Sequence, residues 1–107
     1  MTIKYKNAKV DLTTTGATAV LTASSDTTCI IKSIIVSEDS GNADTITLTI
    51  TDSADAVFSL FNVKAVSANT SIELLSAPLI LAESEILKAT AATANRLHVV
   101  ASYMEIS

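Results

Sequence analysis

The sequence predicts an all-β protein, with a single antiparallel β-sandwich domain over residues 1–107. The main observation is the stretch 45–51, where threonine alternates with isoleucine or leucine without interruption. A strand there has one apolar face and one hydroxyl-bearing face, as in a sheet with one face covered. About eight short segments of this kind follow one another, with turn residues between them. Such spacing is typical of a sandwich or barrel, and we expect a jelly-roll or immunoglobulin-like arrangement.

The element predictions follow from alternation and from the density of β-branched residues. Clusters of Gly, Pro, Ser, Asn and Asp mark the turns. With only two glycines in the chain, we expect Asn and Asp to take the backbone positions with positive φ, at Asn42, Asp44, Asn69 and Asn95. The predicted strands cover residues 3–11, 17–23, 27–38, 45–51, 56–66, 71–75, 79–81, 86–90 and 96–106.

Four of these segments carry further information. Residues 3–11 contain three lysines, which suit an edge strand, and the alternation slips at Asn7, which predicts a bulge or a bend. Residues 27–38 are apolar on both faces, which indicates a strand covered on two sides or a strand in a sheet that another chain covers. Residues 56–66 fit a strand broken at Asn62, or alternatively one helical turn around Phe58 and Phe61. Residues 45–51 are expected to be a central strand.

Composition excludes several function classes. The net charge is −4, whereas a nucleic-acid-binding domain needs a basic surface. No apolar stretch reaches the ~20 residues needed to span a bilayer, and no secretory signal is apparent at the N-terminus. Charged residues make up only 17 % of the chain, below the ~25 % of ordinary soluble domains. We expect much of the surface to meet other protein chains.

The residues indicate no catalytic site and no cofactor. His98 is the only histidine and Cys29 the only cysteine. One histidine and one cysteine cannot make a typical zinc site, and no nucleophile elbow or glycine-rich phosphate loop occurs. Cys29 stands in an apolar run and is expected to be a small buried residue. The enzyme hypothesis therefore depends on His98 as a general base, and we predict a protein that is not an enzyme.

Two groups of residues are candidates for binding. Glu38, Asp39, Asn42 and Asp44 bring oxygen ligands together in one loop and form a weak calcium candidate, without the regular EF-hand spacing. The alternative is a solvated hairpin loop. Phe58 and Phe61 are candidates for an inter-subunit interface, because large aromatic side chains dominate interface energetics; the alternative places them in the core.

Three stretches resemble small β-sandwich virion proteins of tailed bacteriophages, especially those of marine phages and cyanophages. These stretches are Thr14–Ala23, Thr28–Val36 and the C-terminal part, Glu85–Ala89 with Leu97–Ile106. Glu83-Ser84-Glu85 stands where these proteins carry a Gly-Asp type of turn. The resemblance implies a structural particle component without catalysis: a capsid decoration or cement protein, a head–tail connector or a tail component.

We therefore expect a non-enzymatic capsid decoration protein on the outside of the major capsid shell. Its partners would be the major capsid protein or neighbouring virion proteins and further copies of itself, with no nucleic acid, no membrane and no cofactor. Its location would be the virion, assembled in the host cytoplasm. A head–tail connector or tail component is the first alternative. A module that binds glycans or cell-surface ligands is a more distant one.

Overall fold

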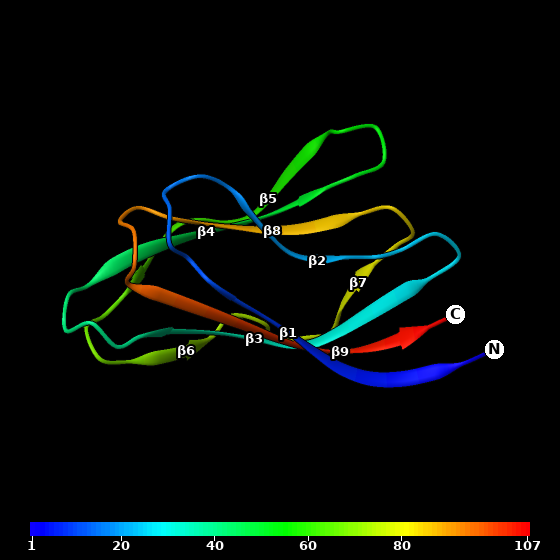
Figure 1. Ribbon diagram of the computed structural model, residues 1–107, viewed down its shortest axis with the longest axis horizontal. Helices are drawn as coiled ribbons and strands as arrows, with labels where there is room; N and C mark the ends of the chain where they lie inside the picture. Colours follow the sequence, from blue (N-terminus) through cyan, green and yellow to red (C-terminus); the bar gives the residue numbers. More distant parts are fainter.

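The computed structural model describes all residues from Met1 to Ser107 and contains nine strands and no helix (Figure 1). No segment of the structure is a helix that could cross a membrane. The strands form two antiparallel sheets that pack face to face, which confirms the predicted β-sandwich. Their bounds are β1 Ile3–Asp11, β2 Thr18–Thr22, β3 Thr28–Glu38, β4 Asp44–Thr51, β5 Val57–Val66, β6 Ser71–Glu73, β7 Leu79–Leu81, β8 Ile86–Ala91 and β9 Leu97–Ile106.

The strand order is that of a jelly roll. Sheet A has the order β1-β9-β3-β6, with β7 also paired to β3, and sheet B has the order β2-β8-β4-β5. β6 and β7 are two halves of one edge strand, interrupted by residues 74–78 with Pro78, because proline cannot continue a hydrogen-bonded ladder. Counting them as one gives eight strands in the two four-stranded sheets of a jelly roll. The immunoglobulin-like alternative has a different strand order.

The core lies between the two sheets and is almost entirely aliphatic. From sheet B it takes Ile46, Leu48 and Ile50, the apolar face predicted for residues 45–51. β4 lies between β8 and β5, so the prediction of a central strand is confirmed. The remaining buried side chains come mainly from alternate positions of β3, β8 and β9, namely Cys29, Ile31, Ile34, Val36, Leu87, Ala89, Ala91, Leu97, Val99, Ala101 and Tyr103.

Backbone irregularities differ from the predictions at several positions. β1 pairs with β9 without a break from Ile3 to Asp11, so the bulge predicted at Asn7 is absent. The register shifts lie instead in the pairings of β2, β3 and β5. Asn69 and Asn95 have the expected positive φ, whereas Asn42 and Asp44 do not. The other positive-φ residues are Asp26, Gly41, Asp55, Val63 and Ser84.

β5 is a strand from Val57 to Val66, one residue shorter than predicted, and the helical alternative around Phe58 and Phe61 is wrong. The expected break is present as two register shifts against β4, and at Val63, which has φ +54°. A β-branched residue rarely adopts this conformation because its side chain crowds the backbone. Thr47 Oγ1 accepts a hydrogen bond from the Val63 N–H at 3.0 Å and helps to hold it.

Candidate functional site

The acidic loop after β3 is held together by the carboxylate of Glu38. Oε1 accepts N–H donors from Gly41 and Asn69, each at 3.1 Å, and Oε2 accepts the N–H of Ser40 at 2.8 Å and its hydroxyl. The Ser40 hydroxyl is the largest cause that lowers the pKa of Glu38, from 4.5 to about 2, and the three N–H donors add to it. Glu38 is thereby a structural carboxylate with its lone pairs committed.

The other candidate calcium ligands point to different partners. Asp44 is buried, and its Oδ2 accepts the N–H of Thr93 at 3.2 Å. Asn42 donates to the carbonyl of Ser40 at 3.4 Å, and Asp39 faces His98. The four side chains therefore do not gather around one point. No group of three or more His, Cys, Asp or Glu side chains is arranged to hold a metal ion.

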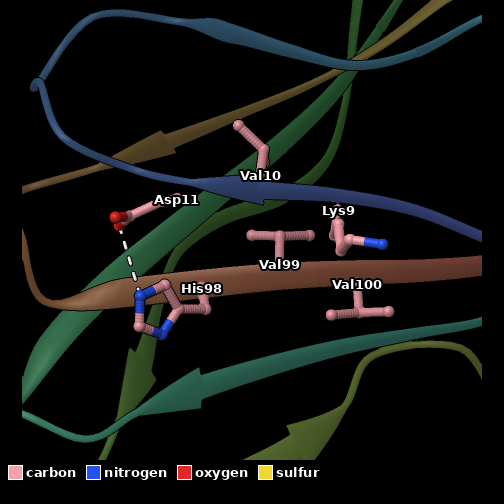
Figure 2. Close-up of a pocket in the computed structure, with 6 residues that line it drawn as sticks. All are labelled: Lys9, Val10, Asp11, His98, Val99 and Val100. Atoms are coloured by element: carbon pink, nitrogen blue, oxygen red, sulfur yellow. Dashed lines mark ion pairs between the residues drawn. The ribbon is translucent and has the colours of Figure 1, made fainter.

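His98 lies between two carboxylates on the outer face of sheet A. Its Nε2 is 3.3 Å from Asp11 Oδ1, and its Nδ1 is 3.8 Å from Asp39 Oδ1. Figure 2 shows the Asp11–His98 pair bridging β1 and β9. Beside it, Lys9 to Asp11 and His98 to Val100 line an open hollow of about 250 Å³. The His98 side chain is 42 % exposed, so this is a solvated surface cluster.

Cys29 and His98, the residues that could serve as nucleophile and general base, lie far apart. Cys29 is on the inner face of β3, and burial raises its pKa. His98 pairs with Ser37, eight residues along β3 from Cys29 and on the outer face, so roughly 25 Å separates them. This geometry gives the thiol no base and keeps it as a thiol, as expected for a buried packing residue.

The outer face of sheet A also carries an uncovered apolar surface. Tyr5 pairs with Met104, Met104 with Ile30, and Ile30 with Ile80, so four apolar side chains form one row across β1, β9, β3 and β7. Tyr5 is 81 % and Ile80 61 % exposed. Paired residues point to the same face of a sheet, so this row is continuous.

A second row extends this surface towards the chain ends. Ile3, which is exposed, pairs with Ile106. Lys6 and Glu105 lie on the opposite face, where they form an ion pair of 3.2 Å. The exposed Lys32 is the nearby charge on β3, two residues from Ile30 in the register shift of that strand. We call the six residues the apolar rows: Ile3, Tyr5, Ile30, Ile80, Met104 and Ile106. Exposed apolar surfaces of this kind are typical of sites that contact other molecules.

The two phenylalanines have different surroundings. Phe61 is half-buried and packs against the core, whereas Phe58 is exposed, although its partner Ile50 is buried. Phe61 and Leu60 line one side of a groove of about 240 Å³, and residues 74–79 line the other. The alternative prediction, a place in the core, therefore fits Phe61, whereas Phe58 remains a candidate for an inter-subunit interface.

Sequence reasoning did not find the apolar rows or the His98 cluster. The alternation in residues 3–6 and 103–106 contained the signal for the rows, since it places Ile3 with Tyr5 and Met104 with Ile106. The His98–Asp11 pair had no local signal, because the two residues are 87 positions apart and meet only through the β1–β9 register. Neither any protein-family model nor any curated protein sequence matches this chain.

Proposed function

We propose that this protein is a non-enzymatic structural component of a bacteriophage virion, and specifically a capsid decoration protein bound to the outside of the major capsid shell. The observation that carries this proposal is the pair of apolar rows, which offer a rigid, apolar surface for docking on another protein. Surfaces built on sheets keep their shape, so they suit a part that binds many identical positions.

Three further observations support this role. The chain resembles small virion proteins in the three stretches described above. Jelly rolls are common among capsid proteins, which is an analogy at the level of the fold. The net charge of −4 would repel packaged DNA and favours a place outside the shell. The solvated His98 and the distant, buried Cys29 support a role without catalysis.

The test is the copy number of the protein in purified particles, measured by quantitative mass spectrometry against the major capsid protein. A number comparable with that of the shell protein is the expected result for decoration. A number that matches a single ring would replace decoration by the connector or tail alternative. Absence from particles would end the virion proposal.

A further inference from the structure

β5 differs from the other edge strands of the sandwich. β1 carries Lys4, Lys6 and Lys9, and such charges discourage pairing with another chain. β2 has only five residues, and β6 and β7 have three each. β5 has ten residues, with neither charge nor proline from Val57 to Val63. It is the one long edge of the molecule that lacks charged protection.

The same edge holds a concentration of exposed apolar side chains. Val57 is 64 %, Phe58 56 %, Val63 59 % and Leu60 36 % exposed, four of the nine large hydrophobic side chains on the surface. The β4–β5 hairpin extends away from the rest of the sandwich, at the upper right in Figure 1. The groove beside Phe61 continues this surface towards residues 74–79. Together these features make an accessible edge with an apolar groove beside it.

The charges at the two ends of β5 indicate which molecule would bind along this edge. Asp55 precedes the strand, and Lys64 lies near its end. Neither residue forms an ion pair within the molecule, although Lys64 Nζ lies 6.0 Å from the centre of the Phe61 ring. A second β5 running antiparallel, with Leu60 opposite Leu60, places Lys64 of each copy opposite Ala56 of the other, one residue along the chain from Asp55. A parallel copy would bring like charges together.

We propose that β5 is the surface through which two copies of this chain associate, antiparallel to each other about a twofold axis near Leu60. A twofold contact uses the same patch on both partners and must be complementary to itself. The two register shifts of β5 interrupt its ladder with β4, so the contact depends mainly on side chains such as Phe58 and Leu60. This association does not depend on the virion role proposed above.

Sedimentation equilibrium of the purified protein tests the proposal by charge exchange. The wild type is expected to be a dimer. K64E turns both attractive pairs into repulsive ones and is expected to raise the dimer Kd about tenfold. The double variant D55K/K64E restores opposite charges and should return the Kd to within about threefold of wild type. D55K alone should weaken the dimer as K64E does.

The matched control is D26K. Asp26 is also exposed and has φ +59°, close to the +64° of Asp55, but it lies in the β2–β3 turn. It controls for both the charge change and the backbone strain and should leave the Kd unchanged. If D55K fails to fold, F58S and K64E still test the surface, and each should weaken the dimer.

Three results would overturn the proposal. In the first, the wild type remains a monomer at every accessible concentration. In the second, K64E leaves the dimer Kd unchanged. In the third, the double variant D55K/K64E dimerises as weakly as K64E. A monomer would assign the surface to a partner with a different sequence. Because the experiment needs no particles, its failure is distinguishable from absence of the protein from virions.

Discussion

The Glu38 carboxylate accepts a hydrogen bond from the backbone N–H of Asn69, which lies 31 residues further along the chain, at 3.1 Å. The same carboxylate accepts donors from Ser40 and Gly41. One side chain thus joins the β3–β4 loop to the β5–β6 turn. It therefore connects the loop that follows β3 of sheet A with the turn that follows β5, the edge strand of sheet B.

This network makes stability depend on pH. Because the pKa of Glu38 is lowered from 4.5 to about 2, its contribution is complete above pH 4.5 and is lost as pH falls towards 2. We expect E38Q to lower the Tm at pH 7, and the difference from wild type to shrink between pH 4.5 and 2. Calorimetry across this range checks it, with the exposed Glu83 changed to Gln as the control. A Tm difference that is constant with pH would contradict the prediction.

Two adjacent isoleucines test the assignment of the faces of β3. Ile34 is completely buried, whereas Ile35 is 41 % exposed on the outer face. We expect I34A to lower the free energy of unfolding by about 2–5 kcal/mol, because it leaves a cavity in the core. I35A should cost less than ~1 kcal/mol. Urea denaturation of both variants gives the comparison, and equal effects would mean that the faces are assigned incorrectly.

The apolar rows make a prediction about binding to the shell. I80K places a charge at the exposed end of the first row without touching the core, so the fold and Tm should remain close to wild type. Binding to shells that lack the protein should weaken at least tenfold, because the contact proposed above would bury the charge. Co-sedimentation with purified shells measures this. The control is T22K, which places the same charge at an exposed position of sheet B. If T22K weakened binding to the shell as much as I80K, the apolar rows would not be the binding surface.

Cys29 is expected to be unreactive in the folded protein. It is 1 % exposed, and burial raises its pKa, so both access and thiolate content are low. With a thiol reagent at pH 8, the native protein should react at least about a hundredfold more slowly than the urea-unfolded protein, where the chain is open. Rapid labelling of the native protein would mean that β3 opens locally.

Val63 provides a test of backbone strain. At φ +54° a valine is strained, while glycine adopts this conformation without a steric cost. We expect V63G to raise the free energy of unfolding by about 1 kcal/mol, measured in the K64E background to separate folding from association. V57G, on the same strand but without positive φ, should lower it. Destabilisation by both changes would show that the side chain of Val63 contributes more than its strain costs.

The strands were predictable because their information is local. Residues 45–51 alternate without a fault, and β4 has the predicted apolar face. Irregularities were less predictable, since they depend on the partner strand. The slip in the alternation at Asn7 produces no bulge, because β1 pairs continuously with β9, while β3 shifts register between Ile31 and Ser33. The sequence predicts the individual strands, but the register in which two strands pair cannot be read from it.

The candidate surfaces were harder to predict for a related reason. The side chains of the apolar rows come from four strands, and only the sheet order brings Tyr5 beside Met104 and Ile30 beside Ile80. The sequence makes Glu38 a calcium candidate, because its neighbouring carboxylates are visible there. Its donor from Asn69 comes through tertiary structure and was not visible.

The position of β9 has a consequence for folding during synthesis. β9 lies between β1 and β3, so neither of these strands has its long hydrogen-bonded neighbour until residues 97–106 have been translated and have left the ribosome. Until then β1 has no paired neighbour and the side of β3 that faces β9 is unpaired, whereas β6 and β7 can already pair with the other side of β3. The nascent chain therefore depends on its final strand to close sheet A, and a ribosome that stalls before residue 97 would expose a chain prone to aggregation.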